Sequence, residues 1–165
     1  MDIELHENSG QMSRIESLYF NELEYNEDSP FYFAAGIPGF EEHTAFLFVE
    51  QPHTSPLIFM QSLRDTAVCF VGLPAAAIDP DYRLQLSPEE GVALGLPWSE
   101  NPEIGQEIFC LALITIVEGS DPVANLMSPI VVNLKNRKGI QAIQLGSHYS
   151  LRHPLAPEHE AASCS

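Results

Sequence analysis

The chain has 165 residues, which is the usual size of one compact domain. It carries 23 Asp and Glu against 7 Lys and Arg, a formal net charge of −16, so phosphate backbones are repelled and direct nucleic-acid binding is disfavoured. Hydrophobic residues make up 45% and charged residues only 18%, a composition that excludes a wholly disordered protein.

Segments for export or membrane insertion are not expected. The longest apolar run, Ile108 to Val117, is far shorter than the roughly 20 residues of a membrane-spanning helix. The first ten residues are acidic and lack Lys and Arg, unlike a secretory signal. No two of the three cysteines, Cys69, Cys110 and Cys164, form a CxxC pair. The first two lie in apolar runs, where free thiols behave as small hydrophobic side chains. We therefore expect a cytoplasmic protein.

Short apolar runs separated by Pro, Gly, Asn and Asp predict an all-β fold. We expect strands at Glu16–Tyr25, Phe31–Ala34, Ala45–Glu50, Leu57–Ser62, Ala67–Leu73, Tyr82–Leu86, Glu107–Val117, Ile130–Leu134 and Ile140–Leu145. The first alternates apolar and acidic residues, as a half-buried antiparallel strand does. Residues 1–12 and 156–165 are polar, small or acidic, so we expect a disordered extension and tail around one β domain of residues 13–155.

Three connections have recognisable local chemistry. Gly36-Ile37-Pro38-Gly39 predicts a turn, and Asn133 to Gly139 predicts a hairpin loop that directs Lys135, Arg137 and Lys138 outward. Ser87-Pro88-Glu89-Glu90 predicts a capped helix start, and Gly95 its end, which gives one short connecting helix. Residues 95–106 follow as a surface loop.

Catalytic and metal-binding patterns are weak. His148, His153 and His159 have no companion ligands at a metal-site spacing, and Ser147 beside His148 lacks the strained turn of a hydrolase nucleophile. Asp79 and Asp81 are able to bind a cation or to act as acid and base, but a solvated turn explains them more simply. We expect no enzyme activity, no cofactor and no metal.

The charge distribution is more informative. No Lys or Arg lies between Arg14 and Arg64 or between Arg83 and Lys135. Such an anionic surface either keeps a small protein soluble or docks a basic protein partner while repelling RNA. Composition alone leaves both interpretations open.

Six ordered motifs resemble the flagellar assembly factor FliW family along residues 14 to 155. They are Gly36-Ile37-Pro38-Gly39-Phe40-Glu41, Met60-Gln61-Ser62, Asp79-Pro80-Asp81-Tyr82, Ala124-Asn125-Leu126 with Pro129-Ile130-Val131-Val132-Asn133, Arg137-Lys138-Gly139 with Gln141, and Tyr149 with Arg152-His153-Pro154-Leu155. Five residues depart mildly from the family pattern: Asn21, Ala34, Ala35, Val123 and Ser128.

The resemblance implies a small antiparallel barrel-like β domain of the cytoplasm with two protein partners. One is flagellin, and the other is the RNA-binding translational repressor CsrA. In that scheme the protein binds CsrA and relieves repression of flagellin synthesis, until accumulated flagellin captures the protein instead. We expect a monomer when the protein is alone. A flagellin chaperone without CsrA regulation, a structural flagellar component and a metal-dependent enzyme are the alternatives.

Eight residues are candidates for partner binding. Glu41, Glu42, Asp79 and Asp81 are the acidic groups that we expect to face CsrA, because they lie in predicted loops. Arg137, Lys138 and Arg152 are cations in an anionic chain, which either bind an acidic patch or balance local carboxylates. Phe40 is an exposed anchor or, as we favour, a core residue. We expect Asn125 to cap a turn and Pro129 to begin a strand.

Overall fold

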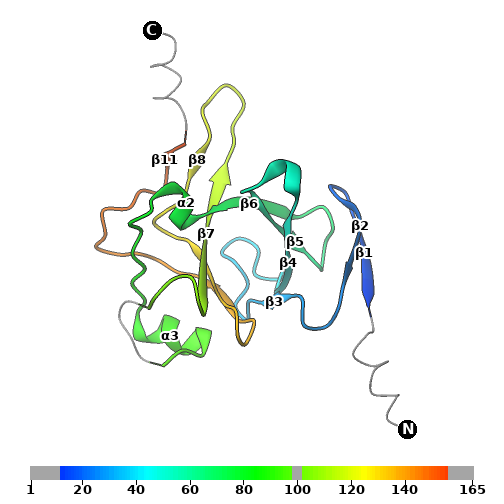
Figure 1. Cartoon of the computed structure of the whole chain (residues 1–165), viewed down its shortest axis with the longest axis horizontal. Coiled ribbons are helices and arrows are strands. Elements are labelled where there is room, and N and C mark those ends of the chain that lie inside the picture. Colours follow the sequence, from blue (N-terminus) through cyan, green and yellow to red (C-terminus); the bar gives the residue numbers. More distant parts are fainter. Residues whose placement is uncertain (1–11, 98–101, 156–165) are drawn as a thin grey trace.

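The computed structural model describes residues 12–97 and 102–155, which fold almost entirely into antiparallel strands (Figure 1). The strands are β1 (Ser13–Ser17), β2 (Asn21–Tyr25), β3 (Phe31–Tyr32), β4 (Ala45–Glu50), β5 (Ile58–Ser62), β6 (Cys69–Pro74), β7 (Ile108–Thr115), β8 (Val123–Ala124), β9 (Ile130–Asn133), β10 (Gly139–Gln141) and β11 (His153–Pro154). The helices are η1 (Pro52–Thr54), α2 (Ala75–Ile78) and α3 (Pro88–Leu94). The predicted all-β class is therefore confirmed, and α3 is the predicted connecting helix.

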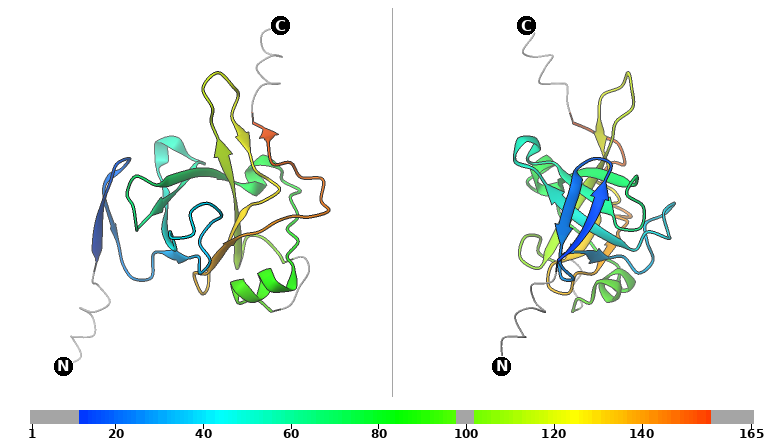
Figure 2. Two further views of the ribbon diagram at one scale, coloured as in Figure 1. Left: turned by 180° about the vertical axis from the view of Figure 1, so that it is seen from behind. Right: turned by 90° about the vertical axis from the view of Figure 1, so that its right-hand side faces the viewer.

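The main sheet runs in the order β10-β9-β7-β6-β5-β4-β3. Beyond the end of the β7–β9 pairing, β8 pairs with β7, and β11 pairs with β8. The sheet curls until its two end strands meet at a single bridge between Tyr32 and Lys138, where the Tyr32 N–H donates to the Arg137 carbonyl at 2.8 Å (Figure 2). The fold is thus barrel-like as predicted, but no continuous ladder among the described strands closes it into a barrel.

Strand β7 is buried on both faces, which explains why its sequence is a continuous apolar run. Ile108, Cys110 and Ala112 point into one core cluster, with Leu84 and Leu94. The intervening residues of β7 point into a second cluster, built mainly from β3, β4, β5 and β9. Successive side chains of a strand face opposite ways, so this one strand separates and supports both cores.

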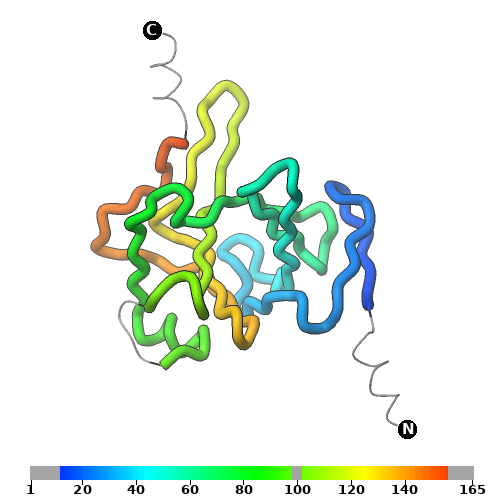
Figure 3. Tube along the Cα trace, in the orientation of Figure 1, coloured from blue at the N-terminus to red at the C-terminus, as the bar shows by residue number. Residues whose placement is uncertain are grey.

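The segment Glu16–Tyr25 is not the single strand that its alternation predicts, but the hairpin of β1 and β2. The Ser17 hydroxyl accepts hydrogen bonds from the N–H groups of Tyr19 (3.0 Å) and Phe20 (3.3 Å), which reverses the chain, and Asn21 follows with a φ of 61°. A Ser hydroxyl stabilises such a turn, and Asn tolerates positive φ better than most residues. Figure 3 shows this hairpin, in blue, beside the main body.

Tyr82–Leu86 is also not the strand that was predicted, although alternate residues of this segment are buried. No ladder forms because the partner is a side chain. The Gln144 carboxamide oxygen accepts from the Gln85 N–H at 2.9 Å, and its amide nitrogen donates to the Gln85 carbonyl at 2.8 Å. One buried glutamine thus supplies the pair of hydrogen bonds that a neighbouring strand normally provides.

Most other predicted strands are present with shifted ends. The predictions for β4, β5, β6, β7, β9 and β10 overlap the observed strands, whereas β3 is shorter and the two-residue strands β8 and β11 were missed. The predicted terminal extensions, except for residue 12, lie outside the described residues, as do residues 98–101 of the predicted surface loop.

Helix α3 begins and ends as predicted. Ser87 and Glu90 form a reciprocal capping box, and Gly95 ends the helix in the left-handed conformation with a φ of 70°. The last carbonyl, that of Leu94, accepts hydrogen bonds from the side-chain amides of Asn133 (2.8 Å) and Asn136 (3.0 Å). The helix is therefore attached at its C-terminus to the loop between β9 and β10. Within the described residues no helix is long and apolar enough to cross a membrane.

Candidate protein-binding surfaces

The predicted turn at Gly36–Gly39 is present, and Phe40, which follows it, lies at the surface. The Phe40 N–H donates to the Ile37 carbonyl at 2.6 Å, and Gly39 takes a φ of 88°, as the third residue of a type II turn requires. Phe40 is 38% exposed, and its ring packs edge-to-face on Phe70 with the centroids 5.0 Å apart. The interpretation of Phe40 as a core residue is therefore wrong, because the tight turn holds it outside the sheet.

Glu41 and Glu42 follow this turn, and both are exposed. One carboxylate oxygen of Glu41 accepts from the Gly39 N–H at 2.9 Å. This hydrogen bond and one from its own backbone hold the pKa of Glu41 below its usual value. Glu42 forms an ion pair with Arg64 at 3.0 Å. Of the two, only Glu42 has a carboxylate that the turn itself does not use.

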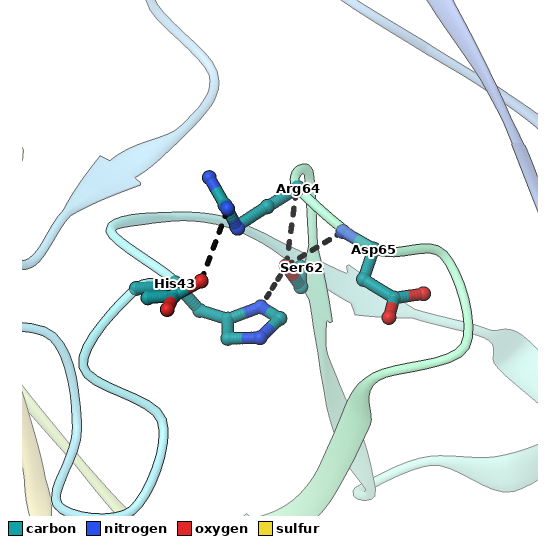
Figure 4. A network of polar contacts seen from close by, with 5 residues as sticks. His43, Ser62, Arg64 and Asp65 are labelled. Carbon is teal, nitrogen blue, oxygen red and sulfur yellow. Dashed lines mark hydrogen bonds and ion pairs between the residues drawn. The ribbon is translucent and has the colours of Figure 1, made fainter.

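A partly buried polar cluster connects the segment after this turn to β5 (Figure 4). The Ser62 hydroxyl accepts from the N–H groups of Arg64 (3.0 Å) and Asp65 (3.3 Å) and lies 2.7 Å from Nδ1 of His43. Because both acceptor positions of the hydroxyl are used, its proton points to His43. Ser62 is fully buried. The Ser–His contact therefore orients a turn, and the serine oxygen is not accessible to a substrate.

Asp79 and Asp81 lie after α2, on a different loop from Glu41 and Glu42. The Asp79 carboxylate accepts from the Asp81 N–H at 2.9 Å, which is the hydrogen-bonded turn that we favoured over a catalytic pair. The Asp81 side chain is exposed. No hydrogen bond or ion pair joins the two acidic loops in the described part of the chain.

The three candidate cations have different environments. Arg137 lies over the Phe31 ring, with its guanidinium carbon 3.7 Å from the ring centroid, and it donates to the carbonyls of Ser29 and Pro30. It thus holds β3 in place and does not point outward as predicted. Lys138 and Arg152 are exposed, and neither has a carboxylate at ion-pair distance among the described residues.

An apolar groove lies where the sheet nearly closes, and sequence reasoning missed it. Its lining consists of Tyr32, Ala34, Ala35, Thr44, Ala93, Lys138, Gly139 and Ile140, and its volume is about 470 Å³. The backbone of Gly139 packs closely on the buried Phe33 ring, since a Cβ on Gly139 would lie 2.5 Å from it. Three separate segments build this groove, so no local pattern in the sequence indicates it.

The histidines and carboxylates of the described residues do not gather into one site. Within residues 12–97 and 102–155, no three His, Cys, Asp or Glu side chains are close enough to hold a metal ion. His148 stacks on Tyr149 with the ring centroids 4.4 Å apart, and His153 lies in β11. His159 lies outside the described residues.

Comparison with known proteins identifies the family. The family model described as FliW protein matches residues 14–155. The chain belongs to the FliW family. A FliW of Syntrophomonas wolfei, described as a flagellar assembly factor, is 30% identical over 143 residues, which cover 86% of this chain and 88% of the relative. A FliW of Desulfitobacterium hafniense is 33% identical over 148 residues, covering 90% and 94%.

A crystal structure of the flagellar assembly factor FliW superposes with a TM-score of 0.77 at 28% identity, over 88% of this chain and 99% of that one. The FliW-like motifs of this chain lie mainly at positions that hold the fold. The Tyr82 hydroxyl donates to the Leu126 carbonyl at 2.6 Å, and the Tyr149 hydroxyl accepts from the Arg83 N–H at 2.8 Å. Asn125 caps a turn by accepting from the Ser128 N–H at 2.8 Å, as predicted.

Pro129 stands immediately before β9, also as predicted. These motifs therefore identify the FliW fold more directly than they identify a binding surface.

Proposed function

We propose that this FliW-family protein is a cytoplasmic regulatory binding protein without catalytic activity that exchanges two protein partners. Bound to CsrA, it relieves translational repression of flagellin. Bound to newly made flagellin, it acts as a chaperone and releases CsrA to repress again. Membership of a family of flagellar assembly factors is the observation that carries this proposal.

The net charge of the protein supports the proposed binding of CsrA. A protein with a net charge of −16 attracts a basic RNA-binding protein and repels the RNA that competes for it. Glu42 and Asp81 are the most suitable of the four proposed acidic contacts, because both are exposed and the backbone does not use their carboxylates. Glu41 and Asp79 each hold a turn together and contribute mainly by positioning these neighbours.

Binding of flagellin requires a different surface. Flagellin segments that assemble with one another are expected to be amphipathic helices, and such helices bind by burying an apolar stripe in a groove. The exposed Phe40 and the apolar groove at Tyr32 and Lys138 are available for this purpose.

Titration calorimetry with CsrA from the same genome tests the exchange. We expect binding that weakens as NaCl is raised and that soluble flagellin abolishes. If the protein binds flagellin but not CsrA, it is a flagellin chaperone without CsrA regulation. Absence of both interactions would refute the proposed function.

Matched charge variants test the acidic contacts. E42Q/D81N removes two carboxylates, and E50Q/E118Q removes two other exposed carboxylates, so the net charge changes equally. We expect the first pair to weaken CsrA binding at least tenfold and the second pair at most threefold. Equal effects would mean that only the overall charge acts and that Glu42 and Asp81 make no contact.

A further inference from the structure

The groove where the sheet nearly closes has rigid walls. Ala93 belongs to α3, which is held at its C-terminus by the side-chain amides of Asn133 and Asn136. On the opposite wall, the Tyr32 N–H is fixed by the Arg137 carbonyl. A groove held in this way exists before a ligand arrives, and its volume of about 470 Å³ lies in the range of roughly 300–1,000 Å³ typical of binding pockets.

The lining accepts large apolar side chains. Ala34, Ala35 and Ala93 are small, and Tyr32 and Ile140 add an aromatic and a branched apolar side chain to the lining. The small alanine side chains leave room for a branched or aromatic side chain from outside. Burial of such a side chain contributes about 1.5–3 kcal/mol in general.

The groove favours a helix over an added strand. Three of the backbone groups beside it are already paired: the Tyr32 N–H binds the Arg137 carbonyl, the Phe33 N–H binds the Thr44 carbonyl, and the Lys138 carbonyl accepts from the Asn133 N–H. A partner strand would need unpaired groups of this kind. A helix satisfies its own backbone and contributes side chains only.

Lys138 favours a negative charge on a helix bound in the groove. It is exposed at the groove, and no described carboxylate lies at ion-pair distance from it. Elsewhere the anionic surface repels acidic partners, so this position is favourable for a carboxylate on an otherwise apolar helix face.

We propose that this groove binds an amphipathic helix of a partner protein, which buries a large apolar side chain between Ala34, Ala35 and Ala93 and pairs a carboxylate with Lys138. The inference rests on the proposed function in one respect, since flagellin is the partner that supplies the helix. It adds to the proposed function the surface at which the flagellin helix binds.

Paired variants test the site, with soluble monomeric flagellin from the same genome as the probe. A93W fills the groove, and A77W places the same side chain on an exposed position of α2 outside it. K138E reverses the charge at the groove, and K135E makes the same change of net charge at an exposed position of the same loop. We expect A93W and K138E to weaken flagellin binding at least tenfold, and the two controls at most threefold.

The possible results separate the site from the function. If the wild-type protein binds flagellin and A93W and K138E bind it equally well, the groove is not the binding site. The proposed function is unaffected by that result. Absence of flagellin binding by the wild-type chain refutes the proposed binding of flagellin, and the groove proposal falls with it. A change in self-association of A93W without a change in flagellin binding also overturns the proposal. CsrA binding by each variant, measured in parallel, verifies that the variant is folded.

Discussion

Gln61 is one of the side chains that connect the β1–β2 hairpin to the main sheet. It is fully buried, accepts from the Ser17 hydroxyl at 2.8 Å and donates to the Ser62 carbonyl at 3.0 Å. Its amide also lies within hydrogen-bond distance of the carbonyls of Thr66 and Val68. Since the hairpin forms its own two-stranded sheet, this side-chain contact substitutes for a shared ladder.

We expect Gln61→Ala to lower the free energy of unfolding by about 2–4 kcal/mol, because it leaves buried polar groups unpaired and opens a cavity. Gln85→Ala is the control, since that side chain is exposed and its backbone groups make the contacts. Urea denaturation measures both. A loss below 1 kcal/mol for Gln61→Ala would show that water or a rearranged turn satisfies the exposed partners.

The described thiols are protected by burial. Burial raises the pKa of Cys69 to about 11 and that of Cys110 to about 12. At pH 8 the thiolate fraction of Cys69 is therefore about a hundredfold below that of an unperturbed thiol. We expect iodoacetamide to modify Cys69 slowly and Cys110 only on unfolding, as peptide mapping by mass spectrometry measures. Rapid alkylation of Cys110 in the native protein would contradict the packing around β7.

Helix α3 depends on its cap because it has only seven residues. An isolated helix of that length is unstable in water, so its ends and its packing hold it. We expect Ser87→Ala to reduce stability by about 1 kcal/mol, since the capping box is lost. Ser120→Ala, at an exposed position in the β7–β8 connection, is the control and should change stability by less than about 0.5 kcal/mol. Equal effects of the two substitutions would show that the cap contributes nothing.

The same helix illustrates what the sequence predicts well. Capping and turn chemistry are local, so Ser87, Gly95 and the Gly36–Gly39 turn were located correctly. Tyr82–Leu86 was assigned to a strand because a short apolar run between turn residues does not reveal the hydrogen-bond partner, which here is the Gln144 side chain. Glu16–Tyr25 was read as one strand because alternation continues through a turn made by Ser17.

The candidate surfaces likewise divide into local features that the sequence predicts and features that depend on distant parts of the chain. Exposure of Glu42 and Asp81 followed from their loops, whereas the inward position of Arg137 depends on Phe31 and on carbonyls more than 100 residues earlier in the chain. The groove is built from three distant segments and appears only in the folded chain.

For the molecule as a whole, charge repulsion opposes folding. The ion pairs among the described residues, Arg14 with Glu22 and Glu24 and Arg64 with Glu42, are all exposed. Exposed pairs contribute about 0–1 kcal/mol each, so they offset little of the repulsion that a net charge of −16 produces. Compacting the chain brings the excess carboxylates closer together than in the unfolded state.

Added salt should therefore stabilise this protein. The Debye length is about 30 Å at 0.01 M and about 3 Å at 1 M, so salt suppresses long-range repulsion among many carboxylates while it weakens only a few exposed pairs. We expect Tm to rise by several degrees between 0.02 and 0.5 M NaCl, as differential scanning calorimetry measures, and KCl to give the same slope because screening depends on ionic strength alone. A Tm that falls with salt would mean that attractive pairs outweigh the repulsion, and the anionic surface would then be internally balanced instead of free to attract a basic partner.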